Sequence, residues 1–412
     1  MSRFVFFSMN NFEHEGGGTI RMLGIMNELS KRNHEVIFIS NTKKFHLFEK
    51  NIKHVTINFS LSRKDKRIFQ GLLGLLPNFI MCLIYAKLFN KLRQIFKDKF
   101  DKETIYFFEY LDNSIGYCLK SINIITNYIN DLHGVATLEF KFQAEHAKSL
   151  SEKIKFWVKY KISDWLDSKV FNLAEGFIFA SQAMQDYFTE QYPNVFQKRN
   201  YILPYVLSSV AITEKVDSDL KGELQRKFNC QPNEKIIFFA GAFKKTGGVP
   251  DLILAFEKIV NQNNTRLFIV GDGPTMPECV SIVKEKNIAD KVVLIGRIPY
   301  HQLRTYQDLS DIIVCPDKQN VYSELIVHVK YLDALISGKL VINGSFKSVK
   351  EINVDEFLSV DFKPSDVESL SKAIQYSLDN LEMFSQKYAN NKEYAKQNLT
   401  YASHVSILEK ND

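Results

Sequence analysis

Short apolar runs alternate with amphipathic stretches along most of the chain. Short, mostly apolar runs of four to six residues are typical of strands buried on both faces, and the helices between them connect parallel neighbours. A first series lies at 4–7, 36–40, 54–57, 105–108, 124–128 and 176–180, and a second at 235–240, 267–270, 291–295 and 311–316. The pattern predicts an α/β protein with two doubly wound, Rossmann-like domains.

The apolar pattern lapses near 201–204, and the stretch 208–221 is polar, as expected of a linker. With 412 residues the chain is too long for one ordinary core. We therefore predict an N-terminal domain over 1–205 and a C-terminal domain over 206–385, followed by amphipathic helical sequence.

Glycine-rich turns follow several predicted strands. Gly16, Gly17 and Gly18 precede a helix over 20–31, and Gly271 directly follows the strand 267–270. Glycine lets the backbone approach a ligand, and ligands of open parallel sheets bind beyond the carboxyl ends of the strands. We predict that Gly17 and Gly18 contact phosphate or sugar oxygens, although a flexible turn would explain the same glycines. A helix predicted over 322–336 makes the turn at 320–325 a candidate pyrophosphate site.

Composition narrows the class of protein. Hydrophobic residues make up 45% of the chain and charged residues 24%, which is ordinary for a globular protein. Five dispersed cysteines without C-x-x-C spacing argue against a disulfide framework or a zinc site. The first apolar run is short and glycines soon follow it, so it predicts a strand rather than a signal peptide. We therefore expect a cytoplasmic protein.

Positive charge is concentrated between residues 41 and 100. This stretch holds thirteen basic and three acidic residues, a local charge of +10, whereas the whole chain carries +6. No nucleic-acid-binding motif accompanies it. Its uncharged part, 71–86, is shorter than the ~20 residues that span a bilayer. Two interpretations stay open: a buried helix pair with solvated flanks, or an interfacial patch that binds anionic lipid through Arg63, Lys64, Lys66, Arg67, Lys87, Lys91 and Arg93.

Several motifs resemble glycosyltransferase family 4. In the C-terminal half the similar segments are Val270–Pro274, Val293–Pro299 and Leu332–Ile342. The N-terminal half is similar at Gly16–Gly18, Arg32–Val36, Asp131–Gly134 and Phe179–Met184. Order and spacing agree over most of the chain, and residues 42–125 are the least recognisable.

The resemblance implies a GT-B fold, in which two Rossmann-like domains face a cleft. The C-terminal domain would hold a nucleotide diphosphate sugar, and the N-terminal domain a glycan or lipid-linked acceptor. Transfer would retain the anomeric configuration without a bound metal or other cofactor. The final segment, 386–412, would pack back on the N-terminal domain. The basic stretch adds the expectation of peripheral attachment to the inner face of a membrane.

The resemblance also assigns roles to single residues. His133 matches the family histidine that points at the transferred sugar, and Gly271, Arg297 and Ile298 fall in the donor site. The family's two diphosphate-neutralising cations are replaced here by Ala242 and Gly247. We predict that Lys244 and Lys245 supply this charge from shifted positions.

The family's acidic pair is only partly preserved. Asp333 matches the member that holds ribose hydroxyls, but the other position is Leu325, and the carboxylate is one residue earlier at Glu324. We predict that Glu324 faces the transferred sugar and that Glu324 and Leu325 lie in the donor site. A helix dipole favouring the Glu324 carboxylate is the alternative explanation.

Four other interpretations are weaker or remain open. Asp217 and Asp219 have a spacing known from metal-dependent glycosyltransferases, but a helix cap explains them better. The turn 271–273 lacks the third glycine of a dinucleotide site. A sugar-nucleotide epimerase and a non-catalytic glycosyltransferase-like scaffold stay as alternatives to a transferase.

Overall fold

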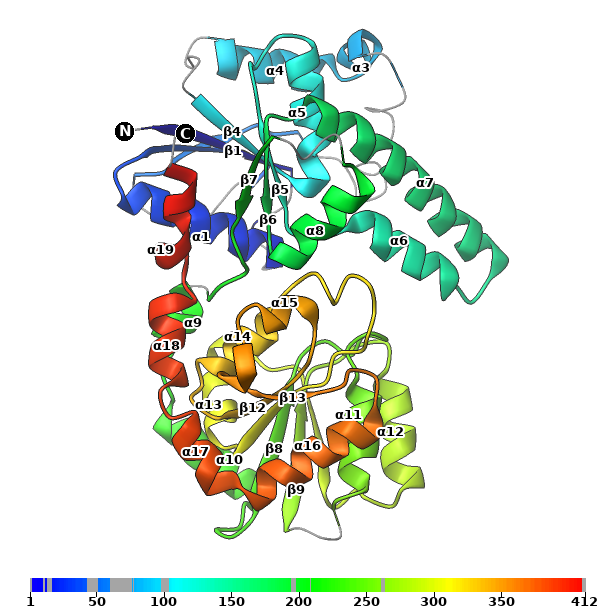
Figure 1. The fold of residues 1–412 in the computed structure, drawn as a ribbon, viewed down its shortest axis with the longest axis vertical. Coiled ribbons are helices and arrows are strands. Elements are labelled where there is room, and N and C mark those ends of the chain that lie inside the picture. Colours follow the sequence, from blue (N-terminus) through cyan, green and yellow to red (C-terminus); the bar gives the residue numbers. More distant parts are fainter. Residues whose placement is uncertain are drawn as a thin grey trace. The chain divides into compact units, whose positions relative to one another are not determined.

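The computed structural model describes residues 2–9, 12, 17–42, 51–59, 76, 78–97, 104–193, 198–207, 209–260 and 264–409. The chain forms two compact units, one of Met1–Tyr205 with His404–Asp412 and one of Val206–Ser403. Each unit is a parallel sheet covered by helices (Figure 1). This confirms the predicted α/β class with two Rossmann-like sheets.

The first unit is built on a seven-stranded sheet in the order β3-β2-β1-β4-β5-β6-β7. Its central strands are almost entirely apolar and are covered on both sides, which is why they read as continuous apolar runs. Aromatic side chains fill this core, and Phe6 stacks on Phe107 with 4.8 Å between ring centroids. The strands are β1 (Arg3–Ser8), β2 (Glu35–Ser40), β3 (Lys53–Thr56), β4 (Thr104–Glu109), β5 (Ile129–Leu132), β6 (Gly176–Phe179) and β7 (Arg199–Ile202).

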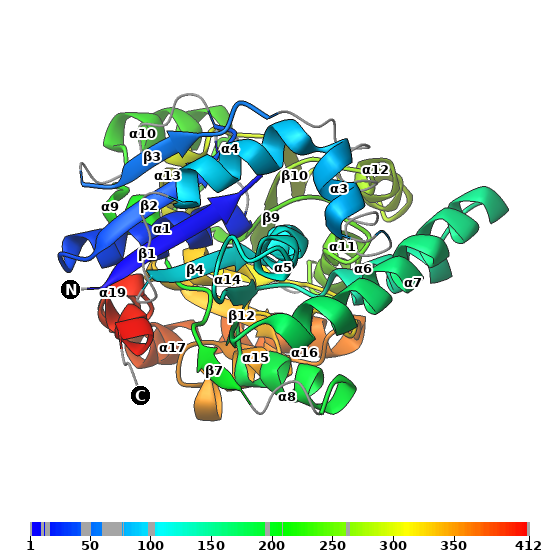
Figure 2. The same ribbon diagram turned by 90° about the horizontal axis from the view of Figure 1, so that it is seen from above.

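Helices connect these strands. Two of them, α6 and α7, pack on each other as a hairpin that projects from the rest of this unit (Figure 2). The helices are α1 (Gly17–Lys31), α3 (Asn78–Ile84), α4 (Ala86–Lys97), α5 (Asn113–Ser121), α6 (Ala136–Glu145), α7 (Leu150–Leu173) and α8 (Gln182–Gln191).

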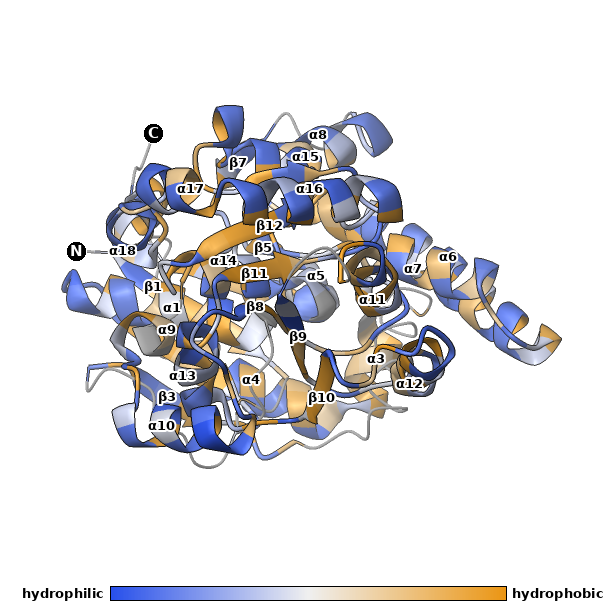
Figure 3. Ribbon diagram, turned by 90° about the horizontal axis from the view of Figure 1, so that it is seen from below, coloured by the Kyte–Doolittle hydropathy of each residue, from blue (hydrophilic) through white to orange (hydrophobic). Residues whose placement is uncertain are grey.

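The second unit has a six-stranded sheet in the order β10-β9-β8-β11-β12-β13. Its strands are the most hydrophobic segments of the unit, and the helices around them turn polar faces outward (Figure 3). The strands are β8 (Lys235–Ala240), β9 (Thr265–Val270), β10 (Val292–Gly296), β11 (Ile312–Cys315), β12 (Leu340–Gly344) and β13 (Val360–Phe362). The helices are α9 (Ser209–Thr213), α10 (Ser218–Lys227), α11 (Val249–Glu257), α12 (Met276–Glu285), α13 (Leu303–Asp308), α14 (Val329–Leu335), α15 (Lys347–Lys350), α16 (Val367–Asp379), α17 (Leu381–Lys387) and α18 (Asn391–Asn398).

Strand order fixes where each unit can bind a ligand. In the first unit the order reverses between β1 and β4, and in the second between β8 and β11. Loops from the two sides of such a switch point diverge and leave a crevice beyond the carboxyl ends of the strands. Ligand-binding residues are therefore expected directly after these four strands.

Two predicted elements were wrong. The strand predicted at 124–128 lies instead at β5, because Asn123 adopts a left-handed conformation (φ 56°) and the chain turns there. The polar Asn130 and Asp131 concealed β5 from the apolar pattern. The helix predicted over 322–336 begins only at Val329, since the Asn320 side chain accepts a hydrogen bond from the Ser323 N–H and closes a turn first.

Domain boundaries also differ in detail from the sequence pattern. The polar stretch 208–221 is largely helical, in α9 and α10. Asp217 caps α10 by accepting from the N–H groups of Asp219 and Leu220, which confirms the capping interpretation. Of the segment 386–412, residues up to 403 belong to the second unit and 404–412 to the first, where Glu409 pairs with His34 and Arg32.

Candidate functional site

A cluster of four charged residues lies at the carboxyl edge of the first sheet, where β4 and β5 end. It consists of Arg21, Glu109, Asp131 and His133, and we call it the N-terminal cluster. His133 Nε2 is 3.4 Å from Glu109 Oε1, and its Nδ1 is 3.3 Å from Asp131 Oδ2. Arg21 of α1 donates from Nε and Nη2 to Asp131 over 2.9–3.0 Å. The cluster is a continuous chain of alternating charge.

Burial and pairing fix the charge states within the N-terminal cluster. The side chains of Arg21 and Asp131 are 0% and 6% exposed. Burial alone would lower the pKa of His133, but its contacts with Asp131 and Glu109 raise that pKa to about 9. Burial would raise the pKa of Asp131, yet Arg21 and His133 hold it below its ordinary value. The contacts with Asp131 and Glu109 therefore favour the protonated form of His133, in which both ring nitrogens are hydrogen-bond donors.

The start of α1 lies directly against this cluster. A Cβ on Gly18 would come within 2.8 Å of both Glu109 Oε1 and His133 Nε2. A larger residue would have to displace these two side-chain ends, which gives a steric reason for glycine at position 18 and places two predicted residues, Gly18 and His133, side by side. Gly17 begins the same helix. Sequence reasoning missed Arg21 and Glu109, because a single arginine on a helix and a glutamate ending an apolar strand carry no distinctive spacing.

Glycine turns in the second unit join neighbouring strand ends. Gly271 has φ 134°, and a Cβ there would lie 1.8 Å from the Gly241 carbonyl oxygen. Gly248 has φ 67°, and its Cβ would lie 1.7 Å from the Pro316 oxygen. The backbone of the loop after β8 thus packs against the ends of β9 and β11. Gly271 is required for this close approach, whatever it also does for a ligand.

The predicted cations of this unit are exposed. Lys244 and Lys245 lie in the loop between β8 and α11, and within the described ranges neither has an acidic partner. Lys244 is close enough to His328 to help lower its pKa, although burial is the larger cause. Arg297 is 78% exposed and its Nε is 3.5 Å from Asp272, and Ile298 beside it is half-buried.

Glu324 is held by its own unit. One carboxylate oxygen accepts from the Lys347 N–H at 2.7 Å, where α15 begins, and the other accepts from the Gln319 side chain. The Glu324 carbonyl also accepts from the Ser348 N–H at 3.0 Å. The neighbouring Leu325 is buried, and its N–H donates to the Tyr322 carbonyl. Glu324 thus caps α15, a contact that the sequence did not reveal.

Asp333 is buried on α14. Its Oδ1 accepts from the Tyr300 hydroxyl at 2.9 Å, and its carbonyl accepts from Gln307 at 3.2 Å. Burial raises the pKa of Asp333 to about 6, against the opposing effects of Tyr300 and Arg304. The Asp333 carboxylate is therefore buried although burial disfavours its charged form, and one of its oxygens already accepts a hydrogen bond from Tyr300.

A further ion pair follows β11 and was not predicted. Lys330 Nζ is 2.7 Å from Asp317 Oδ1, and the ammonium lies 5.5 Å from the Phe239 ring centroid. The other oxygen of Asp317 is buried without a hydrogen-bond partner among the described residues. The signal was available, since Asp317 directly follows an apolar run, as the turn glycines do.

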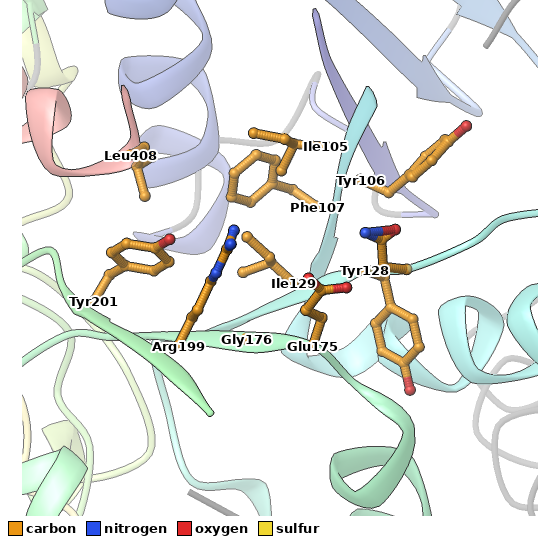
Figure 4. A pocket seen from close by; sticks show the side chains of 11 residues that line it. Ile105, Tyr106, Phe107, Tyr128, Ile129, Glu175, Gly176, Arg199, Tyr201 and Leu408 are labelled. Carbon is orange, nitrogen blue, oxygen red and sulfur yellow. The ribbon is translucent and has the colours of Figure 1, made fainter. Parts of the chain in front are cut away.

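A hollow in the first unit lies away from these residues. It opens at the amino ends of β4, β5, β6 and β7, the edge opposite the N-terminal cluster. Arg199, Tyr201 and Glu175 line it together with apolar side chains (Figure 4). None of the predicted site residues reaches it. Among the described residues, no group of three or more His, Cys, Asp or Glu side chains is placed to hold a metal ion.

Part of the chain is similar to a known protein family and, over a shorter segment, to a characterised relative. The family model described as "Glycosyl transferases group 1" matches residues 221–398, which span most of the second unit. N-acetyl-alpha-D-glucosaminyl L-malate synthase of Bacillus anthracis is 33% identical over 75 residues, 18% of this chain and 20% of that protein's own length.

Solved structures resemble the whole chain. Sucrose-phosphate synthase from Thermosynechococcus elongatus superposes with a TM-score of 0.72 at 15% identity, covering 99% of this chain and 98% of that one. HepE of Anabaena, solved in complex with UDP and glucose, gives a TM-score of 0.70 at 11% identity, with coverage of 99% and 98%. At such identities the likeness establishes the fold.

Proposed function

We propose that this chain, a protein of the glycosyltransferase type with the GT-B fold and a group 1 domain, transfers a sugar from a nucleotide diphosphate donor to a glycan or lipid-linked acceptor, retaining the anomeric configuration. The observation that carries the proposal is the domain match over 221–398, which includes the loops after β9, β10 and β11. It is supported by the UDP and glucose bound to HepE, a protein of the same fold.

In this proposal Lys244 and Lys245 bind the donor diphosphate. Both are exposed and unpaired with acids within the described part of the chain, so an anionic ligand need not displace an existing partner. Positive charge at this point stabilises the diphosphate as it leaves, when its negative charge grows. Asp333 accepts from ribose hydroxyls, and the charged His133 donates to the sugar. We expect no metal requirement, so EDTA should leave turnover unchanged.

A donor screen tests the proposal. Nucleotide diphosphate sugars should raise the melting temperature, and the best of them should lose its sugar to an added acceptor. The variant Lys244→Ser/Lys245→Ser should lose UDP affinity far more than uridine affinity, because charge-assisted bonds go to phosphate. Lys363→Ser/Lys372→Ser, which removes two lysines of 80% and 76% exposure elsewhere in the unit, is the matched control. Equal losses for UDP and uridine would contradict the assignment.

Two observations favour a non-catalytic scaffold as a second candidate. The Glu324 carboxylate caps α15, and Ala242 and Gly247 stand where the family has cations. Donor binding without hydrolysis or transfer, across lipid-linked and soluble acceptors, would decide for the scaffold.

We further propose that the acceptor is met at an anionic membrane surface through the stretch 41–100. Of the predicted patch, Arg63, Lys64, Lys66 and Arg67 lie outside the described residues. The described part supports an interfacial role: α3 exposes Phe79 and Leu83 by 66% and 73%, and Lys87 and Arg93 on α4 are exposed. No helix in the described ranges is long and apolar enough to cross a membrane. Replacing Arg63, Lys64, Lys66 and Arg67 with serine should weaken flotation of the protein with anionic liposomes.

A further inference from the structure

The helix α7 packs on α6 with one face and exposes a row of apolar side chains on another. One face packs on α6, where Lys159 lies over the rings of both Phe140 and Phe156. The other face points outward and carries four apolar side chains at helical spacing: Leu150, Ile154, Trp157 and Val158, exposed by 74%, 55%, 54% and 41%. We call these four residues the α7 stripe. A stripe of large exposed apolar side chains marks a surface that binds something.

Lysines flank the α7 stripe. Between residues 146 and 161 there are five lysines and one acidic residue, Glu152, a local excess of four positive charges. Lys153, Lys155 and Lys161 are exposed, and Lys161 Nζ is 5.8 Å from the Trp157 ring centroid. Long lysine stems allow the ammonium groups to stay at a charged interface while their carbons cover apolar surface.

We propose that the outward face of α7 docks on a lipid bilayer that contains anionic headgroups. This surface combines apolar and basic side chains, which is the combination that binds an anionic bilayer. The Trp, Leu, Ile and Val side chains of the α7 stripe enter the boundary of the acyl chains, and the lysines contact the negatively charged headgroups. A protein partner of mixed surface charge would not need this excess of lysine. The hairpin of α6 and α7 projects from its unit, so a flat surface can reach the stripe without meeting the sheet (Figure 2).

The α7 stripe lies apart from the basic stretch 41–100 in the sequence. The docking does not depend on glycosyl transfer, so a protein without transferase activity could still show it. Conversely, a transferase that fails to bind vesicles through α7 would leave the proposed function intact.

Tryptophan fluorescence reads this surface directly, because the chain has two tryptophans, Trp157 and Trp165, and both are on α7. Trp165 is partly buried with Lys169 stacked 4.0 Å from its ring centroid, so Trp165→Phe leaves Trp157 as a single reporter. Vesicles of phosphatidylglycerol should shift its emission to the blue and let brominated lipid quench it. Phosphatidylcholine vesicles should not, and 1 M salt should reverse the change, because the screening length falls to about 3 Å.

Substitutions then locate the contact. Replacing Lys153 and Lys155 with serine should weaken vesicle binding roughly thirty-fold, at about five-fold per lysine. Ile154→Ser/Trp157→Ser, followed by flotation, should weaken it at least about ten-fold. Val354→Ser/Tyr376→Ser, which removes apolar side chains of 59% and 54% exposure from the second unit, is the matched control and should bind like wild type.

Three results would overturn the proposal. One is wild-type protein that does not bind phosphatidylglycerol vesicles at low salt. Another is flotation without a blue shift of Trp157, which would mean that a different surface binds. The third is a blue shift that grows with protein concentration in the absence of lipid and is accompanied by α7-dependent dimerisation, which would make a second copy the occupant.

Discussion

The N-terminal cluster of the first unit and the lysines of the β8–α11 loop in the second hold their charges in opposite ways. In the N-terminal cluster the charges are largely buried and lie against partners within the protein, from the 13% exposure of the His133 side chain down to the 0% of Arg21. In the second unit Lys244 and Lys245 stand exposed on a loop. A paired buried charge lies in a fixed position before any ligand arrives, whereas an exposed lysine gains its partner only when an anion binds.

This difference separates stability from function. Breaking a buried pair leaves an uncompensated charge in the protein interior and should destabilise the fold strongly. Removing an exposed lysine should leave the fold unchanged and weaken only ligand binding. The residues between these extremes, Asp333 and Glu324, are the ones for which stability and function must both be measured.

Replacing Arg21 should have the largest effect on the stability of the fold. Arg21→Met keeps the apolar stem but leaves the buried Asp131 with His133 as its remaining cationic contact, and we expect the free energy of unfolding to fall by about 3–5 kcal/mol. Urea unfolding measures this. Arg3→Met is the matched control, since Arg3 pairs with Glu35 at 2.6 Å at a surface position of 30% exposure. The control should lose about 0–1 kcal/mol. Similar losses in both variants would mean that the N-terminal cluster is not a special stabilising element.

The next largest effect is a pH dependence of the free energy of unfolding, which we expect from His133. Its pKa is raised to about 9, so its stabilising contribution is complete below its unfolded pKa near 6.5 and is lost as pH rises through 9. The loss is on the order of 3 kcal/mol. We expect the unfolding free energy to fall between pH 6.5 and 9.5 in wild type, and to fall less in His133→Gln. Parallel pH profiles for the two proteins would show that His133 is not held as a cation.

The fold was largely predictable because it rests on buried parallel strands, which leave unbroken apolar runs such as those of β1 and β8. β5 was misplaced for the opposite reason, since it carries polar residues to the site. Gly18 and His133 were proposed as site residues from a glycine run and from resemblance; the structure brings them together, and their roles stay predictions.

Contacts between distant positions could not be predicted in this way. Arg21 meets Asp131 across 110 positions of sequence, and Glu324 meets Lys347 across 23. No local pattern encodes such a pairing, because it depends on which strand ends the fold brings together. The shifted register of Glu324 acquires a physical explanation only when α15 is seen beside it.

Replacing Asp333 should change the stability of the fold and the affinity for the donor in opposite directions. With its pKa raised to about 6, the buried carboxylate destabilises the fold progressively as pH rises from about 4 to 6, and fully above that. Asp333→Asn should therefore raise the unfolding free energy at pH 8 by about 2–3 kcal/mol. If Asp333 also holds ribose, donor affinity should fall by about 1–3 kcal/mol in the same variant.

A matched variant tests this assignment of Asp333. The pKa of Asp361 on β13 is also raised to about 6, mainly by burial, and its Oδ1 accepts from the Asn353 side chain at 2.8 Å. Asp361→Asn should stabilise the fold in the same direction and leave donor affinity unchanged. If Asp333→Asn stabilises without any loss of donor affinity, its role is confined to packing against Tyr300.

The smallest effect expected is at Glu324, where a cap competes with a catalytic role. As a cap on α15, Glu324 should cost about 1 kcal/mol of stability on change to Ala, much as Asp217→Ala should for the cap of α10. If the carboxylate also faces the transferred sugar, Glu324→Gln should lower turnover more than donor affinity, since its interaction strengthens as positive charge builds on the anomeric carbon. Asp217→Ala should leave turnover per folded molecule unchanged. A Glu324→Gln protein that matches this control in turnover would restrict Glu324 to capping, and the catalytic charge would then have to come from another residue.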